Sequence, residues 1–450
     1  MGSFNEAEKI VLLFDNYLSD SQKLHTSFKT AGRNCLAAVI EDDGFLPEDV
    51  MSVFGYFLGE FSKSEQIPGK PIAFYQVKVP MHWEIIGQNA NGKIMDLNKE
   101  RGRIFYAAPS HKRMVKAVDW YDEKGVVRST DHYNKYGALY ARTIFNAKGQ
   151  KVNKTYFSST GKEIIMENYV TKNIILNESD EVKVFRGRTD FVCHFFEKAG
   201  LAQYRIFFNT LSTSFFVSQN LKKEGKQDVL FWQENVGKEI PGNMRFILDG
   251  KAAHTAQIMV QKRDAYDKLI ELGAPSGMLH KLGYVYSFKK ENRNKHEVLI
   301  CTNSDNIEQC SKLVEALPEM HFYIVALTEM SSKLMNFDSY ENVTLYPNVK
   351  LDVVDELFET CDYYLDVNHG TEILAAVEKA FLHNHLILAF NETLHESKYV
   401  SPKHVFPASR VESLIECMKA VISDKAMLDE HLKMQHAHAL LETAEKYLQI

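Results

Sequence analysis

The sequence repeats one five-residue unit four times, as YDEKG (121–125), YNKYG (133–137), FNAKG (145–149) and FSSTG (157–161). An aromatic residue opens each unit, Asp, Asn or Ser follows it, and Gly closes it. The units recur every 12 residues, so seven residues separate one glycine from the next aromatic residue. This spacing is typical of short β-strands joined by tight turns.

The turn residues explain why this unit produces hairpins. Asp and Asn side chains bond to nearby backbone groups in turns, and Gly adopts the positive φ that tight turns require. We therefore predict an antiparallel sheet in which each strand pairs with the next, extended by strand-forming stretches at 104–106 and 174–176. We also predict that the four aromatic side chains stack at one level across neighbouring strands: Tyr121, Tyr133, Phe145 and Phe157.

The repeat lies in a basic segment of an acidic chain. Residues 98–172 hold 15 Lys and Arg against 7 Asp and Glu, whereas the whole chain has a net charge of -6. For any single aromatic ring, covering one sheet face is the favoured explanation, but a single-layer sheet cannot bury both faces. One face or edge must meet another domain, a partner subunit or an extended polypeptide. We predict an interaction module that binds a partner or acceptor through the repeat aromatics and Lys135, Arg142, Lys148 and Lys154.

Nucleic acid is the other ligand that suits a basic, aromatic sheet. However, neither an RNP-like motif nor a strongly basic whole domain accompanies this segment. We therefore predict no nucleic-acid partner.

Short apolar strands alternate with predicted helices on both sides of the repeat, which indicates parallel sheets covered on both faces. The first series has strands at 9–15, 36–40, 204–208, 229–232 and 245–248 and helices at 19–29 and 188–199. The second series has strands at 298–302, 322–326, 343–346, 363–367 and 386–390 and helices at 305–317, 353–360, 371–383, 410–422 and 425–448.

This organisation predicts an α/β fold of the GT-B type, the architecture of many nucleotide-sugar glycosyltransferases. Two Rossmann-like domains would face a cleft, with an extended antiparallel β-sheet inserted in the first. Ligands of open α/β sheets bind beyond the carboxyl ends of the strands, which places the expected site in that cleft. The predicted boundaries are 1–69 and 178–283 for the first domain, 70–177 for the inserted sheet, and 284–450 for the second domain with its C-terminal helices.

The chemistry of a donor site is sparse. The sequence contains no G-x-G-x-x-G, P-loop, D-x-D or H-E-x-x-H motif. The best candidate is NHGTE (368–372), which follows a strand and opens a predicted helix, a place where phosphate or a sugar hydroxyl can bind. Retaining GT-B enzymes often carry an E-x7-E pair here. Glu378 is the candidate second Glu, but Gly370 stands in the place of the first, and Glu372 is only six residues away.

The loop 302–306 also lacks the Arg and Lys with which such enzymes neutralise a diphosphate, and its Asp305 would repel one. We therefore predict no catalytic residue, no cofactor and no metal. The vestigial donor-site positions are Asn303, His369, Gly370, Glu372 and Glu378.

The composition indicates a soluble, cytoplasmic protein. No uncharged apolar run reaches the roughly 18 residues of a membrane helix, and the N-terminus lacks the features of a signal peptide. The six cysteines are scattered without a C-x-x-C pair, which argues for a reducing compartment.

The chain resembles the glycosyltransferase-stabilising proteins of the accessory Sec system, over nearly its whole length. The resemblance rests on EDDGFLPED (41–49), on the inserted repeat around 140–165, and on the degenerate second α/β domain. It implies a non-catalytic chaperone subunit of a protein O-glycosyltransferase. The catalytic partner would transfer N-acetylglucosamine to Ser and Thr of serine-rich repeat adhesins, and this subunit would stabilise the enzyme and help to hold the acceptor.

The resemblance also leaves open a peripheral association at the inner face of the cell membrane. One alternative function remains, namely a catalytically active retaining GT-B glycosyltransferase with an atypical donor site.

Overall fold

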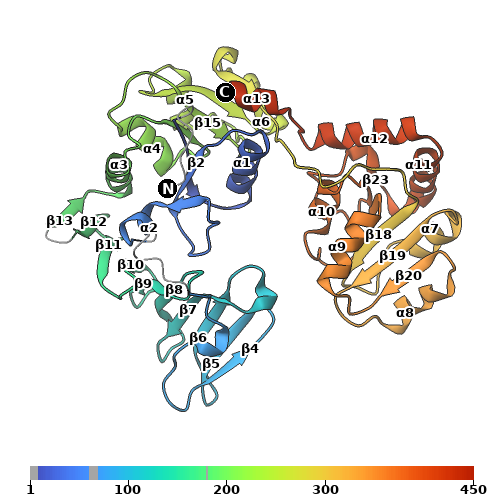
Figure 1. Ribbon diagram of the computed structural model, residues 1–450, viewed down its shortest axis with the longest axis horizontal. Helices are drawn as coiled ribbons and strands as arrows, with labels where there is room; N and C mark the ends of the chain where they lie inside the picture. The colour runs from blue at the N-terminus through green and yellow to red at the C-terminus, as the bar shows by residue number, and fades with distance from the viewer. Residues whose placement is uncertain (1–8, 60–68, 179–180) are drawn as a thin grey trace. The chain divides into compact units, whose positions relative to one another are not determined.

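The computed structural model describes residues 9–59, 69–178 and 181–450, which form two compact units (Figure 1). The first unit contains Met1–His25 and Asn34–Lys281, and the second contains Thr26–Arg33 and Leu282–Ile450. Each unit has its own parallel sheet, and the first also carries a large antiparallel sheet.

The parallel sheet of the first unit has seven strands in the order β17-β16-β15-β14-β1-β2-β3. The central strand β1 is buried from Ile10 to Phe14 because both of its faces are covered, as expected of a parallel strand. The strands are β1 (Ile10–Asn16), β2 (Leu36–Glu41), β3 (Val50–Ser52), β14 (Arg205–Phe208), β15 (Asp228–Trp232), β16 (Thr255–Val260) and β17 (Leu279–Lys281), and the helices are α1 (Ser19–Thr30), α2 (Val53–Phe57), α3 (Arg188–Lys198), α4 (Thr213–Asn220), α5 (Gly242–Leu248) and α6 (Arg263–Glu271).

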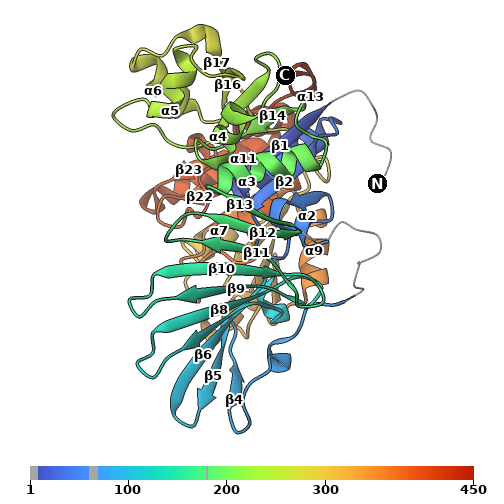
Figure 2. The ribbon, with the colours of Figure 1, turned by 90° about the vertical axis from the view of Figure 1, so that its left-hand side faces the viewer.

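The antiparallel sheet lies in the chain between α2 and α3, and its ten strands pair in sequence order (Figure 2). The repeat therefore forms the predicted meander. Its strands are β4 (Glu84–Gly87), β5 (Asn91–Asp96), β6 (Lys99–Tyr106), β7 (Val115–Tyr121), β8 (Val127–Tyr133), β9 (Leu139–Phe145), β10 (Lys151–Phe157), β11 (Glu163–Asn168), β12 (Ile174–Glu178) and β13 (Glu181–Phe185).

The repeat turns have the chemistry that the sequence predicts. In the turn after β9, the Asn146 side chain accepts hydrogen bonds from the backbone N–H groups of Lys148 and Gln150, at 2.9 and 3.0 Å. Gly149 closes this turn at a φ of 73°, in the left-handed region that favours glycine. The same arrangement follows β7, where Asp122 is the acceptor.

The predicted stacking of the repeat aromatics at one level is wrong. Each aromatic residue ends its strand, so Tyr121 pairs with Val127 and Tyr133 pairs with Leu139, which begin the following strands. Because successive strands run in opposite directions, consecutive aromatic residues lie at opposite ends of the strands, on the two sides of the sheet where the hairpins turn. Phe145 and Phe157 continue this alternation, opposite Lys151 and Glu163.

One face of β9–β12 belongs to the core of the first unit. Tyr156 and Ile165 are buried on it together with Phe54 and Phe191. The rings of Phe54 and Tyr156 stack with centroids 4.6 Å apart. Burial of these side chains joins the inserted sheet to the helices beside the parallel sheet.

The second unit contains a six-stranded parallel sheet in the order β20-β19-β18-β21-β22-β23, with core clusters on both of its faces. Its strands are β18 (Glu297–Thr302), β19 (His321–Ala326), β20 (Val343–Tyr346), β21 (Tyr363–Asp366), β22 (Leu386–Phe390) and β23 (Val405–Phe406), and its helices are α7 (Cys310–Ala316), α8 (Ser332–Met335), α9 (Leu351–Thr360), α10 (Ala376–Leu382), α11 (Val411–Ser423), α12 (Lys425–His438) and α13 (Ala444–Gln449).

Four predicted elements differ from the structure. The predicted strand 245–248 is part of helix α5, because a short apolar run does not distinguish a strand from a buried helix. The predicted helix 425–448 is interrupted between α12 and α13, where Leu440 has a φ of 58°.

The helices predicted at 305–317 and 371–383 both begin about five residues late, at Cys310 and Ala376. Residues with left-handed backbone immediately precede them, namely Gln309 (φ 53°), and Leu374 and Ala375 (φ 58° and 48°). A left-handed residue interrupts the right-handed helical path, so the helix begins only after it.

Candidate functional site

The structure separates the four predicted binding cations of the repeat sheet. The Lys135 ammonium donates to the backbone carbonyl of Leu46 and to Glu48, both at 2.7 Å. Arg142 holds Asp131 through two nitrogens, at 2.5 and 3.1 Å, although its side chain stays 44% exposed. Lys148 is exposed at a turn. Only Lys148 therefore presents its charge to solvent without an ion pair or hydrogen-bond partner for its ammonium among the residues described.

Lys154 has a different environment, on the face that joins the core. Its ammonium lies 4.7 Å from the ring centroid of Tyr156 and 5.9 Å from that of Tyr140. Burial lowers the pKa of Lys154 to about 8, while the negative charges of Glu167 and Asp42 act in the opposite direction. Lys154 therefore contributes to the junction between the inserted sheet and the end of β2.

The opposite face of β9–β13 carries exposed apolar side chains that sequence reasoning missed. Arg142, Met166, Ile175 and Val184 lie on one face, in a row that runs across the strands through Thr155 of β10. Val184 is 63% exposed, and on the same face Val182 is 65% and Ile144 37% exposed. We call these side chains the open face: Arg142, Ile144, Met166, Ile175, Val182 and Val184. The alternation EVKVF (181–185) was the available signal.

In the second unit, the predicted donor-site residues lie at the carboxyl ends of β18 and β21. The Asn303 amide donates to the Thr371 hydroxyl at 2.8 Å, and the Asn368 amide donates to the Asn303 carbonyl oxygen at 3.3 Å. A Cβ atom at Gly370 would lie 1.8 Å from that Asn303 oxygen. The two loops are therefore packed directly on each other, and the chain's own amides occupy the space beside Gly370.

Two histidines reinforce this closure. The His369 ring nitrogen Nε2 lies 2.5 Å from a Glu308 carboxylate oxygen. His395 contacts Asp366 through Nδ1 at 2.6 Å and the carbonyl of Gly370 through Nε2 at 2.7 Å. The hydrogen bond to Asp366 raises the pKa of His395 to about 9, so this ring is a cation at neutral pH. The positive charge of His395 therefore interacts with Asp366 and the Gly370 carbonyl of the same chain.

The two predicted carboxylates do not form a pair. Glu372 accepts a hydrogen bond from the backbone N–H of Val377 at 2.9 Å, and burial raises its pKa. Glu378, in the first turn of α10, accepts from the Tyr399 hydroxyl at 2.5 Å. The predicted helix start at 371 is wrong, because α10 begins at Ala376, and the first turn of the helix is capped by the Glu372 side chain.

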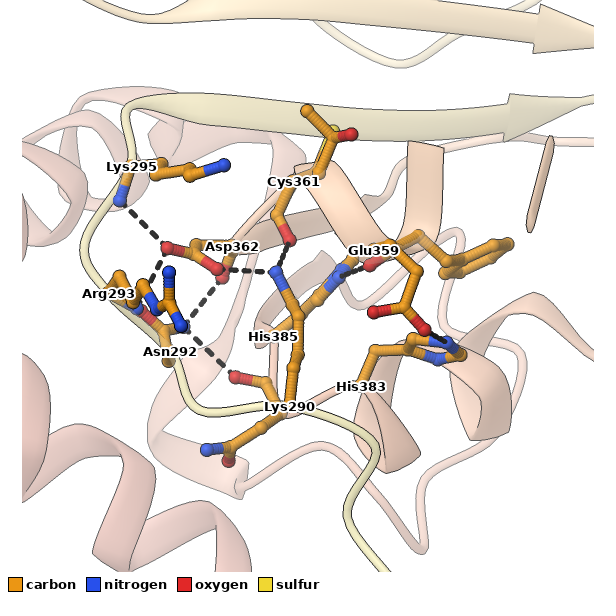
Figure 3. A network of polar contacts seen from close by, with 12 residues as sticks. Lys290, Asn292, Arg293, Lys295, Glu359, Cys361, Asp362, His383 and His385 are labelled. Carbon is orange, nitrogen blue, oxygen red and sulfur yellow. Dashed lines mark hydrogen bonds and ion pairs between the residues drawn. The ribbon is translucent and has the colours of Figure 1, made fainter. Parts of the chain in front are cut away.

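A denser polar network lies at the opposite, amino end of the same sheet (Figure 3). Asp362, which is 1% exposed, accepts from the Lys290 ammonium at 2.5 Å and from the backbone N–H groups of Arg293 and Lys295 at 2.9 and 2.8 Å. Asn292 donates to the backbone carbonyls of Asp362 and Asn384. These bonds attach segment 290–295 to the sheet, and sequence reasoning missed them entirely.

Neither a metal site nor a membrane-spanning helix occurs in residues 9–59, 69–178 and 181–450, the part of the chain that the structure describes. No group of three or more His, Cys, Asp or Glu side chains there has the geometry of a metal site. No helix within those ranges combines the length and hydropathy needed to cross a membrane.

Two parallel α/β sheets, with an antiparallel sheet inserted in the first series, define a protein of the GT-B type. In its second unit the loops after β18 and β21 bond to each other. Models of protein-family domains cover most of the chain. They match the GtfB N-terminal domain at 11–57, the GtfB middle domain at 83–186, the GtfB third domain at 188–272 and the GftB/GlyA-F C-terminal domain at 298–435.

Full-length relatives agree with these matches. The chain is 41% identical to the UDP-N-acetylglucosamine–peptide N-acetylglucosaminyltransferase stabilizing protein GtfB of Streptococcus gordonii, over 96% of this chain and 95% of the relative. It is 40% identical to the stabilizing protein GtfB of Streptococcus agalactiae, over 98% of each chain. The chain belongs to the GtfB family of glycosyltransferase-stabilising proteins.

Solved structures agree with the fold. A chain in the crystal structure of a GtfA/B complex bound to UDP and GlcNAc superposes with a TM-score of 0.89, at 40% identity and over 98% of both chains. A chain of the accessory secretory protein 1, 2 and 3 structure from Streptococcus pneumoniae superposes with a TM-score of 0.61 at 13% identity, which shows a shared fold alone. The predicted α/β class and the resemblance to the stabilising proteins are confirmed, whereas the predicted cleft and domain boundaries stay predictions.

Proposed function

We propose that this chain is the non-catalytic subunit of a protein O-glycosyltransferase and stabilises a catalytic N-acetylglucosaminyltransferase of the GtfA type. The stabilising role follows from the relatives, whose names describe a stabilizing protein rather than the enzyme. The observation that carries the non-catalytic role is the closure of the donor-side loops through Asn303, Gly370 and Thr371.

The open face is the proposed contact for the catalytic subunit. Its apolar side chains, led by Val182 and Val184, are the kind of surface that an obligate partner covers. The edge strand β13 pairs with β12 on one side only, so its other side offers backbone groups to a further strand. Lys135 and Lys154 engage groups of the first unit itself rather than this face. The repeat aromatics Tyr121, Tyr133, Phe145 and Phe157 remain proposed contacts for the partner or the acceptor.

The rest of the proposal concerns the acceptor and the location. Following the family resemblance, the acceptor is a serine-rich adhesin polypeptide, and the complex works in the cytoplasm at the inner face of the membrane. Lys148 and Arg142 are the predicted cations that remain accessible to an acceptor. No cofactor or nucleic acid takes part.

Co-purification tests the partner contact. We expect the V182E/V184E variant to lose most of its association with the co-expressed catalytic subunit, because two buried carboxylates would be unpaired at the interface. The variant L351E/M427E carries the same charge change at side chains that are 42% and 38% exposed in the second unit, and it should bind normally. Full association of V182E/V184E would refute the proposed contact.

A donor titration tests the alternative of an active transferase with an atypical donor site. We expect no calorimetric binding of UDP-N-acetylglucosamine at 1 mM to this chain alone, and full transfer activity in the complex of the catalytic subunit with the E378Q variant. Turnover by the isolated chain that E378Q abolishes would establish the alternative.

A further inference from the structure

The meander places lysines at regular intervals along one row of hairpin turns, which we call one edge of the inserted sheet; this edge crosses the strand ends and is not an edge strand. Because successive strands reverse direction, turns at the same edge recur every 24 residues rather than every 12. Lys124, Lys148 and Lys172 follow this spacing, because they lie between β7 and β8, between β9 and β10, and between β11 and β12. Figure 2 shows the strands of this meander. Neighbouring members are two strands apart, which corresponds to roughly 10 Å.

These lysines differ from the other cations of the sheet. Lys124, Lys148 and Lys172 are exposed, and in the described part of the chain no ion pair or hydrogen bond engages their ammonium groups. In contrast, Lys99 and Arg101 both pair with Glu123 at the same edge. The hairpin ends 146–151 and 169–173 contain no acidic residue, and Lys151 adds a further exposed charge beside Lys148.

The same hairpin ends are suited to contact with an apolar layer. Val170 is 72% exposed at the β11–β12 end, and Leu97 is 89% exposed at the β5–β6 end. Two backbone N–H groups at this turn already have a partner, because the Asn168 side chain accepts from the N–H groups of Val170 and Thr171 at 2.9 and 3.0 Å. These internal bonds lower the desolvation cost of bringing the turn into a lipid interface.

We propose that this edge, formed by Lys124, Lys148, Lys151 and Lys172 with Val170, docks on an anionic lipid surface. Separate lysines at hairpin tips match charge that is spread over a plane, and the exposed valine adds an apolar anchor. An acidic polypeptide is the competing occupant. It is less favoured because hairpin ends offer it neither an open strand edge nor a side-chain pocket. The proposal gives a surface to the membrane association proposed above and does not depend on the catalytic subunit.

Vesicle co-sedimentation of the full chain tests the proposal. We expect binding at 0.1 M NaCl to vesicles of phosphatidylcholine and phosphatidylglycerol (about 70:30) and not to phosphatidylcholine alone, with release at high salt. The K148Q/K172Q variant should bind on the order of 20-fold more weakly, which is roughly fivefold per lysine. V170S should bind a few-fold more weakly.

The matched control is K112Q/K162Q, which removes two exposed lysines from hairpin connections at the other edge. It should bind within twofold of the original chain. Unchanged melting curves would establish that both variants fold. Equal losses in the two double variants, absence of vesicle binding, or binding of soluble polyglutamate without vesicle binding would overturn the proposal. Since vesicle binding needs no partner, its failure is distinguishable from failure of the stabilising function.

Discussion

The two ends of the six-stranded sheet use similar side chains for opposite purposes. At the amino end, the Asp362 carboxylate collects a lysine ammonium and two backbone N–H groups. At the carboxyl end, where the sequence predicts the vestigial donor site, Asn303, Asn368 and Thr371 bond to one another. The amino end is a buried anchor, and the carboxyl end is a self-closed surface.

The carboxyl-end loops keep polar residues, and the described side chains among them bond to one another. The cationic ring of His395 is held there by Asp366 and by the Gly370 carbonyl. The number of charged residues at each end of the sheet therefore does not reveal the role of that end. The bonding partners of each charged group reveal it, and these partners are known only from the three-dimensional structure.

The largest expected effect comes from breaking the anchor at the amino end. D362A should destabilise the second unit by about 3–5 kcal/mol, because it leaves the Lys290 ammonium and two backbone N–H groups without their buried acceptor. Hydrogen exchange of the β21 and β22 amides in the full chain would measure the loss. D429A removes a 49% exposed carboxylate from an ion pair in the same unit and should change stability by about 0.5 kcal/mol or less. Equal protection in both variants would contradict the anchor role.

The two ends should also respond oppositely to pH. The pKa of His395 is raised to about 9, so its stabilisation is complete below about pH 6.5 and is lost as the pH rises through 9. Burial lowers the pKa of His385, in the amino-end network, to about 3, so its stabilisation is present above pH 6.5 and is lost in acid. Because solvent screens the partly exposed His395, we expect about 1–2 kcal/mol from it.

Stability profiles from pH 4 to 9.5 would separate the two histidines. H395Q should flatten the alkaline side alone, and H385Q the acidic side alone. His404, whose pKa burial also lowers to about 3, will keep part of the acidic slope in H385Q. The opposite assignment of slopes would refute this distinction between the ends.

The smallest expected effect tests the closure of the carboxyl end. G370A should cost about 1 kcal/mol, because the new methyl group displaces the exposed Asn303 side chain and its bond to Thr371. In the double variant N303A/G370A the added cost should largely vanish, since the two contacts of the methyl group that are shorter than 3.0 Å are removed and only Asn368 Nδ2 remains, at 3.2 Å. Denaturant unfolding of the four variants of this cycle would measure the coupling, and additive costs would show that the two loops do not close on each other.

Prediction from sequence succeeded where structure is local. Turn chemistry is contained within five residues, so Asn146 and Gly149 predict their hairpin without knowledge of the rest of the chain. Helix starts at Cys310 and Ala376 were predicted too early because the preceding left-handed residues are not glycines and give no signal. Asp362 was missed because its partners lie about 70 residues earlier, in a segment with no regular pattern.

For the predicted site residues, the amino-acid type alone did not reveal which side chains are available for binding, because this depends on the surroundings of each side chain. Lys135, Arg142, Lys148 and Lys154 are similar cations in sequence. In the structure Lys135 is held by a loop, Arg142 by a carboxylate, and the half-buried Lys154 lies beside two tyrosine rings, whereas Lys148 is unengaged within the described ranges. Which lysine meets solvent depends on the strand direction and on which sheet face is covered. Neither property is contained in a five-residue unit.

The 12-residue unit also sets a rule for changes in chain length. Deleting one unit would remove one strand and reverse the direction of every later strand. Lys172 would then lie at the opposite ends of the strands, the exposed valines of β13 would lose their present positions, and the core pairing at Ile165 would be lost. Deleting 24 residues would shorten the sheet by two strands, roughly 10 Å, and leave each later side chain on its original face and edge. Insertions and deletions in this family should therefore occur in pairs of units.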